Sequence, residues 1–190
     1  MGSKLLGAYR QTFTTGAVTT IAAGTATAGH LFAIRNTAAG RQFRLTALEV
    51  EFILTTAFGA AQEVGFDVYM LGDYTTAHSG ATALTLNDGA GRYMPAYSRT
   101  TSLVGRIADA GALTAGVHTM ETNAIARGSC WGTAIGAMLA TRRYDFAGTT
   151  AGGFWFGCEE GFLIRNTVLM GATGVGKWHI TTELEEYEVT

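Results

Sequence analysis

Residues 171–177 carry the residue types of a phosphate-binding loop, because they match most of the pattern Gly-x-x-x-x-Gly-Lys. Such a loop binds phosphate when it opens a helix, where backbone N–H groups and the helix dipole face the anion. It also needs Ser or Thr after the lysine to hold magnesium, and this chain has Trp178 there. The residues that follow Lys177 are β-branched and aromatic, which favours a strand. We therefore interpret 171–177 as a hairpin loop and keep a nucleotide-binding enzyme as a remote alternative.

The run Gly128-Ser129-Cys130-Trp131 resembles the nucleophile segment of papain-like cysteine proteases, in which a histidine activates the thiol. Arg127 stands where that family has a cysteine, and Asn166 precedes His179, the reverse of that family's order. Only 60 residues follow Cys130, which is too few for that family's second domain. We interpret Cys130 as a small buried thiol and predict that the chain is not an enzyme.

Metal-ligating residue types are present but scattered. The four histidines lie far apart in the sequence: His30, His78, His118 and His179. No spacing between them places two on one face of an element, and carboxylates such as Asp67 or Glu159 could reach a metal only through folding. We therefore predict no metal site, no cofactor and no catalytic residue. Two cysteines, Cys130 and Cys158, are too few for a disulfide framework, and pairing or two buried thiols both remain open.

The composition favours a protein that works in contact with other proteins. Charged residues make up 15% of the 190 residues, and there are 11 arginines but only two lysines, against roughly 25% charged residues in ordinary domains. Arginine is favoured at interfaces because its planar fork makes several bonds with little entropy lost per bond. The alternative is a small Thr- and Ala-rich surface with no partner.

The same composition argues against two classes of partner. The net charge is −2 and no run of Lys and Arg occurs, so nucleic acid is not an expected partner. The longest apolar stretch, Cys130 to Ala140, is well short of the ~20 residues that span a bilayer, so no membrane is expected either.

The patterning predicts many short strands and one all-β domain over residues 1–190, with residues 1–29 as a candidate extended N-terminal arm. The chain has one proline and 26 glycines, which mark the turns between the predicted strands. Apolar residues alternate most clearly from Val64 to Met70, which predicts a half-buried strand. In Phe43 to Leu54 the alternation slips at Leu48-Glu49, which indicates a β-bulge.

The tetrapeptide Ile-Arg-Asn-Thr occurs at 34–37 and again at 164–167, each time after an apolar run and before a glycine-bearing turn. A second strand follows each copy, so we predict two hairpins near the two ends of the domain. Arg35, Asn36, Arg165 and Asn166 are candidate structural or interface residues, with the arginines serving loop carbonyls or carboxylates. Phe154-Trp155-Phe156 is predicted as an aromatic strand or platform.

The end of the chain reads as an acidic strand with glutamates at 183, 185, 186 and 188. Charge on a strand commonly marks an exposed sheet edge, because it blocks unwanted pairing. The functional alternative is that Glu183 and Glu185 pair with arginines of a neighbouring protein.

Four stretches together are similar to small virion structural proteins of tailed bacteriophages: Leu31 to Thr37, Glu49 to Phe52, Arg106 to Gly116, and Glu160 to Thr167 with Gly171 to Gly176. The similarity is spread over about residues 30–185 and consists of short runs of similar residues rather than one diagnostic motif. It implies a β-sandwich, jelly-roll-like in its finer form, with no catalytic residues to carry over.

The resemblance implies a capsid decoration or cement protein on the outside of the virion. Its partner would be the major capsid protein, and a homo-oligomer is expected, with a trimer as the first expectation. The alternative within the same particle is a tail or fibre component that binds a receptor or glycan through Trp131, Trp155 and nearby tyrosines.

Overall fold

The computed structural model describes residues 3–15, 29–84, 86, 102–109, 112–114, 116–132, 141–168 and 174–189. Within these ranges every regular element is a β-strand, which confirms the predicted all-β class. In the same part of the chain, no helix is long and apolar enough to cross a membrane.

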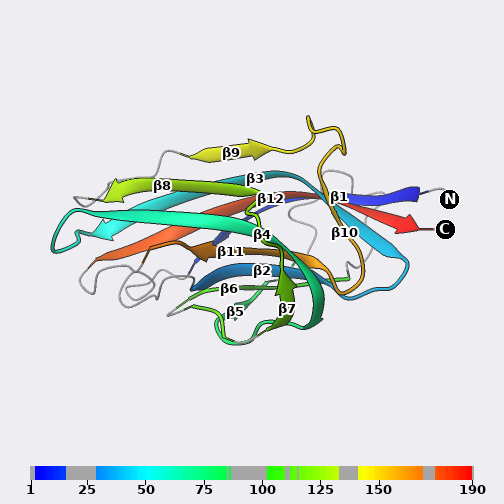
Figure 1. Cartoon of the computed structure of the whole chain (residues 1–190), viewed down its shortest axis with the longest axis horizontal. Coiled ribbons are helices and arrows are strands. Elements are labelled where there is room, and N and C mark those ends of the chain that lie inside the picture. The colour runs from blue at the N-terminus through cyan, green and yellow to red at the C-terminus, as the bar shows by residue number, and fades with distance from the viewer. Residues whose placement is uncertain are drawn as a thin grey trace.

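The strands form two antiparallel sheets, and Figure 1 shows their longer strands running along the long axis of the molecule. Sheet A has the order β1-β12-β3-β10, with β9 also paired to β3. Its strands are β1 (Ser3–Thr14), β3 (Arg41–Thr56), β9 (Arg142–Asp145), β10 (Phe154–Phe156) and β12 (Val175–Val189).

Sheet B has the order β5-β6-β2-β11-β4-β7, with β8 also paired to β4. Its strands are β2 (His30–Asn36), β4 (Gln62–Thr76), β5 (Thr82–Ala83), β6 (Leu103–Ile107), β7 (Val117–Met120), β8 (Ala126–Gly132) and β11 (Gly161–Asn166).

The two sheets pack face to face around one apolar core. The Trp178 ring of sheet A lies 5.7 Å from the Phe66 ring of sheet B, centroid to centroid. Phe156 of sheet A and Phe162 of sheet B lie 6.1 Å apart. All four side chains are fully buried, and such aromatic pairs add about 0.5–1.5 kcal/mol each beyond the burial of their area. These contacts confirm the predicted β-sandwich.

Strand β3 contains the predicted irregularity. Ala47 and Leu48 are both buried, so the alternation changes phase between them. The pairing with β12 steps from Ala47 opposite Glu183 to Leu45 opposite Leu184, which leaves Thr46 as the extra residue of the bulge. The bulge thus lies two residues before the predicted position. It lets both halves of a 16-residue strand face the same core.

The two Ile-Arg-Asn-Thr copies do not open hairpins, and that prediction is wrong. β2 pairs with β6 and β11 in sheet B, whereas β3 pairs with β12 in sheet A, so the turn after Asn36 carries the chain between sheets. The turn after Asn166 also leads from sheet B to sheet A. Strand-turn-strand patterning is the same for a hairpin and for an arch between two sheets, which is why the sequence could not separate them.

The copies instead pair with each other: β2 with β11, and β3 with β12, antiparallel in both cases. This is the arrangement that two copies of one β-arch related by a two-fold axis would have. We therefore describe the centre of the sandwich as two equivalent arches, β2–β3 and β11–β12.

Residues 3–14, at the start of the candidate N-terminal arm, form β1 and pair along β12. Most of the remainder of that segment, residues 16–28, lies outside the described residues. Ser3 pairs with Val189, so the two ends of the described chain lie side by side, as Figure 1 shows.

Strand β4 is present as predicted but is buried on both faces rather than half-buried. Asp67 and Tyr69, on the face away from the core, are 7% and 6% exposed. Leu31, Ala33 and Leu163 of sheet B are also buried. Side chains of sheet B itself help to cover this outer face: Tyr74, near the end of β4, has its ring 5.9 Å from the Arg35 guanidinium.

The close approach of β2 and β11 predicts a severe effect of a methyl group at Gly161. A Cβ atom there would lie 1.9 Å from the backbone oxygen of Ile34. We expect Gly161→Ala to lower the free energy of unfolding by about 3 kcal/mol, because a backbone atom has to move. Urea unfolding followed by far-UV circular dichroism measures this.

The matched control is Gly72→Ala in β4 of the same sheet, where a Cβ atom would meet nothing within 4 Å. That variant should stay within about 0.5 kcal/mol of the wild type. Equal stability of the two variants would show that β2 and β11 are not paired in this register.

Candidate functional site

The residues proposed from the sequence fall on both sheets of the sandwich. Arg35, Asn36, Arg165 and Asn166 belong to β2 and β11 of sheet B, whereas Trp155, Glu183 and Glu185 belong to β10 and β12 of sheet A. The structure therefore does not bring all seven together.

Asn36 and Asn166 stabilise the two passages from sheet B to sheet A that follow β2 and β11. Both are fully buried. The Asn36 side-chain amide donates to the Arg41 carbonyl at 2.9 Å, and its oxygen accepts from the Ala38 N–H and the Ser102 hydroxyl. The Asn166 amide donates to the Val168 carbonyl at 2.9 Å. These side chains replace ladder bonds that the chain loses when it leaves sheet B.

Arg35 and Arg165 both lie against aromatic rings of β4. The Arg165 guanidinium lies 4.4 Å from the Tyr69 ring centroid and donates to the Tyr69 hydroxyl at 2.8 Å. Arg35 lies near the Tyr74 ring and 3.6 Å from Glu159. The Nε atoms of both arginines are buried and have no hydrogen-bond partner among the described residues. The expected structural role fits both residues, with tyrosine as an additional partner.

The acidic strand is not a sheet edge, so that expectation is wrong. β12 is an interior strand of sheet A between β1 and β3. Its glutamates are tolerated there because arginines on other strands of sheet A neutralise them. Glu183 accepts from Arg143 of β9 at 3.0 Å and lies 3.6 Å from Arg10 of β1.

The arginine partners of Glu183 and Glu185 thus come from the same chain. Arg44 of β3 donates through Nε to Glu185 at 2.9 Å, and the Arg44 guanidinium lies 5.2 Å from the Trp155 ring. Trp155 is therefore part of a cluster on sheet A with Tyr187, whose ring centroid is 5.0 Å away. Hydrogen bonds to Glu183 first, and then to Glu49, raise the pKa of Arg143.

Three histidines that the sequence analysis treated as scattered come together at sheet B. We call His30, His78 and His118 the histidine cluster. One nitrogen from each ring lies within 4.8 Å of the other two. His30 Nδ1 lies 2.7 Å from His78 Nε2, and the His118 ring centroid is 5.7 Å and 5.0 Å from those of His30 and His78. Sequence spacing places no two of these histidines on one face of an element, and it is the folding of the chain that brings the three together.

A bulge in β2 explains how His30 joins the cluster. The pairing of β2 with β11 runs from Phe32 opposite Ile164 to His30 opposite Arg165, which leaves Leu31 as the extra residue. Phe32 faces the core and packs on Phe162. Strict alternation would turn His30 inward as well, but the extra residue places it beside Arg165 on the outer face. No spacing in the sequence signals this, because the ligand nitrogens come from three separate segments.

Burial favours the neutral form of the three imidazoles. Desolvation, and then the charges of His118 and Arg165, lower the pKa of His30 from 6.5 to about 4. Desolvation, followed by His30 and His118, lowers the pKa of His78 to about 4. Burial also lowers the pKa of His118. Tyr74 lies against His78 with its hydroxyl 2.5 Å from Nδ1, and burial raises the pKa of that hydroxyl.

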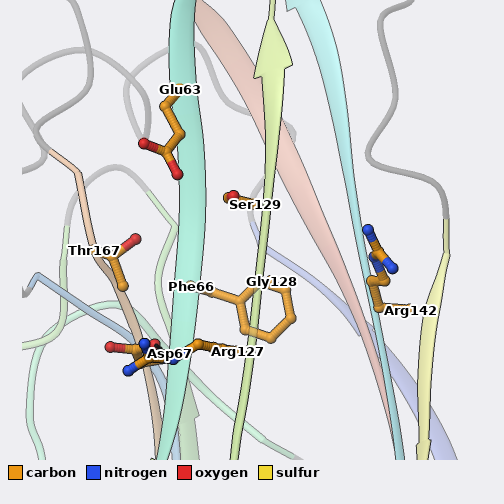
Figure 2. Close-up of a pocket in the computed structure, with 8 residues that line it drawn as sticks. All are labelled: Glu63, Phe66, Asp67, Arg127, Gly128, Ser129, Arg142 and Thr167. Carbon is orange, nitrogen blue, oxygen red and sulfur yellow. Dashed lines mark ion pairs between the residues drawn. The ribbon is translucent and has the colours of Figure 1, made fainter.

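A separate pocket of about 590 Å³ opens beside β4 and β8, and Figure 2 shows its lining. Its walls are mostly polar and charged: Glu63, Asp67, Arg127, Ser129, Arg142 and Thr167, with Phe66 and Gly128. Arg127 and Asp67 lie 3.4 Å apart as an ion pair in its wall. The pocket has the volume of a small-molecule site but a more polar lining than such sites usually have.

The two motifs that suggested enzyme chemistry lie in strands. Lys177 pairs opposite Ile53 within β12, so the chain after Gly174 is a strand and not the helix that a phosphate loop opens. Residues 171–173 of that motif lie outside the described residues. Cys130 lies in β8 of sheet B and His179 in β12 of sheet A.

The thiols do not form the disulfide that the sequence left open. Burial, and then the Glu63 carboxylate, raise the pKa of Cys130, the reverse of what a thiolate nucleophile needs. Both cysteines are free, and Cys158 is exposed, so the alternative of two buried thiols is also wrong.

Comparison with known proteins adds no homologue: no protein-family model matches the chain, and no curated protein matches it in sequence.

The pKa values of the histidine cluster predict that acid destabilises the fold. Between pH 6.5 and about 4, the unfolded chain binds protons at His30 and His78 that the folded chain does not bind. The free energy of unfolding therefore falls as the pH drops through that range. The groups that face the two rings, His118, Arg165 and Tyr74, add no carboxylate that would reverse this sign.

Urea unfolding between pH 7 and pH 4, with EDTA present, measures the effect. We expect the free energy of unfolding to fall less steeply with acid in His78→Gln than in the wild type, because the variant has lost one of the two groups. Parallel slopes in the two proteins would contradict the prediction.

Proposed function

We propose that this chain is a virion structural protein of a tailed bacteriophage, and specifically a capsid decoration or cement protein on the outside of the head. The similarity of residues 30–185 to such proteins supports the proposal, and the β-sandwich is the fold that the similarity implies. Jelly-roll connectivity is the finer form of that fold that we propose. The protein would act by burying surface across junctions of the major capsid protein.

One edge of sheet B carries the proposal, and we call it the β7–β8 edge, residues 117–120 and 126–132. Both strands pair with β4, and neither has another strand partner among the described residues. Trp131 is 68% exposed and Val117 is 59% exposed on this edge. Arg127, on the same face of β8 as Trp131, has a side chain that is 75% exposed.

These features are those of a docking edge. Tryptophan and arginine are enriched among the residues that anchor protein interfaces. Among the described residues β7 and β8 pair with β4 alone, and a strand edge of this kind can offer backbone groups to a partner, although the Arg127 carbonyl already accepts from the Tyr144 hydroxyl. The two lysines lie elsewhere, Lys4 on β1 and Lys177 on β12, which agrees with an interface that uses arginine. We propose that this edge contacts the major capsid protein and that the chain is a homo-oligomer, with a trimer as the first candidate.

Binding to capsids that lack the protein tests the proposal. We expect wild-type protein to bind such particles and to raise the temperature at which they release DNA, because binding to the intact shell stabilises it. Trp131→Ala should weaken binding at least about tenfold, as loss of an interface anchor does. The matched control is Trp155→Ala, which removes a tryptophan from the other sheet and should bind like the wild type.

Two outcomes would overturn the proposal: a protein that stays monomeric and does not bind the particles, or one that locates to the tail. Equal loss in Trp131→Ala and Trp155→Ala would remove the β7–β8 edge from it.

A second candidate function, a tail or fibre component that binds a glycan, is favoured by the pocket beside the same edge. Glu63 pairs directly opposite Trp131, and the polar lining of the pocket continues from it along β4 and β8. An exposed indole ring next to carboxylates and hydroxyls suits the apolar face and the hydroxyl groups of a sugar.

Glycan binding separates the two candidates. If the chain is a glycan-binding protein, Glu63→Gln and Trp131→Ala should each weaken binding to an immobilised glycan about tenfold or more. If it is a cement protein, only Trp131→Ala should weaken capsid binding. An array on which the wild-type protein binds no glycan would exclude the second candidate.

A further inference from the structure

The histidine cluster has the ligand set of a transition-metal site. Three imidazoles approach from three segments: the first residue of β2, the turn after β4, and β7. Three histidine nitrogens and an open fourth position are a known ligand set for Zn²⁺. Imidazole also selects against Mg²⁺ and Ca²⁺, which prefer oxygen ligands.

The spacing of the nitrogens is close to what one ion requires. An ion about 2.0–2.1 Å from each nitrogen would hold the three nitrogens roughly 3.3 Å apart. His30 Nδ1 and His78 Nε2 are closer than this, at 2.7 Å, and all ligand atoms lie within 4.8 Å of one another. Small side-chain rotations therefore suffice to bring the three rings around one ion.

Neighbouring groups already orient the ring of His78. The Tyr74 hydroxyl lies 2.5 Å from Nδ1, so Nε2 is the nitrogen that faces His30. Outer hydrogen bonds of this kind fix ring orientation and tautomer in metal sites. The backbone of Gly116 approaches so closely that a Cβ atom there would lie 2.8 Å from His78 Nδ1.

The cluster also leaves a polar atom unused. His118 Nδ1 is buried without a hydrogen-bond partner among the described residues. Burial of an unpaired polar atom is unfavourable, and a bound ion at that atom would remove this cost. A neutral imidazole carries one lone pair that can bind a metal.

We propose that His30, His78 and His118 together bind one divalent transition-metal ion, with Zn²⁺ as the best match. The ion fastens the turn after β4 and strand β7 to the start of β2. The positive charge of Arg165, which lies beside His30, favours an anionic ligand such as hydroxide at the fourth position. This proposal does not depend on the virion role.

Titration of the intact, EDTA-treated protein with Zn²⁺ tests the proposal directly. We expect one ion per chain with a Kd at or below about 1 μM. Zn²⁺ should also raise the melting temperature, because the ion binds the folded state. Neither Mg²⁺ nor Ca²⁺ should do so. A wild-type protein that binds no Zn²⁺ at 100 μM would overturn the proposal.

Variants locate the ion. His118→Gln changes a half-buried ligand and leaves the buried His78 in place. It should weaken Zn²⁺ binding at least about 100-fold. The matched control is His179→Gln, which removes the histidine that lies beside Glu51 in sheet A and should bind Zn²⁺ like the wild type. Equal binding by wild type and His118→Gln would place the ion elsewhere.

Co²⁺ substitution in the wild-type protein needs no variant to fold. Nitrogen ligation at a four-coordinate site gives intense visible d–d bands without the near-ultraviolet band of a thiolate ligand. That spectrum would support the three-histidine site. A thiolate band would instead assign the metal to Cys130 or Cys158 and overturn the proposal.

Discussion

Two of the chain's passages from sheet B to sheet A follow the Ile-Arg-Asn-Thr copies, and at each of them the backbone groups that leave a ladder need new hydrogen-bond partners. Asn36 and Asn166 supply those partners from fully buried side chains. The backbone of both asparagines is hydrogen-bonded as well: the Asn36 N–H donates to the Glu160 carbonyl and the Asn166 N–H donates to the Gly29 carbonyl. An unpaired buried amide costs about 1–3 kcal/mol, so these two positions decide where the arches turn and how β2 meets β11.

Pairing of equivalent arches puts the acidic strand β12 in the middle of sheet A, and this decides where the charge goes. Arg10 of β1, Arg44 of β3 and Arg143 of β9 reach Glu183 and Glu185 from other strands of sheet A. Glu186 faces inward, fully buried, where the Tyr9 hydroxyl donates to it at 2.7 Å and Arg41 pairs with it. Much of the charge of this sheet is therefore neutralised within the chain. What the β7–β8 edge offers a partner is an indole ring, an apolar side chain and Arg127.

The sequence predicted the fold class because alternation and glycine turns are local signals, and it located Phe43 to Leu54 and Val64 to Met70 as strands. It could not predict the arches, because Ile-Arg-Asn-Thr followed by a turn fits a hairpin equally well. It could not predict the histidine cluster either. His30 reaches the outer face only through a bulge opposite Ile164 and Arg165, and His78 and His118 arrive by pairings that local patterns do not encode. Glu183 and Glu185 were recognised as charged strand residues, but their arginine partners depend on which strands lie on either side.

The position of the second arch has a consequence for how the chain folds. β11 lies between β2 and β4 in sheet B, and β12 lies between β1 and β3 in sheet A. The arch β11–β12 thus supplies an interior strand to each sheet, and it comes from the last part of the described chain. Folding dominated by such non-local pairing is slow, and strand edges that wait for a partner are prone to aggregate. During synthesis, neither sheet can complete its strand pairing until residues 161–189 have been made. The strands made earlier lack their central neighbours until then.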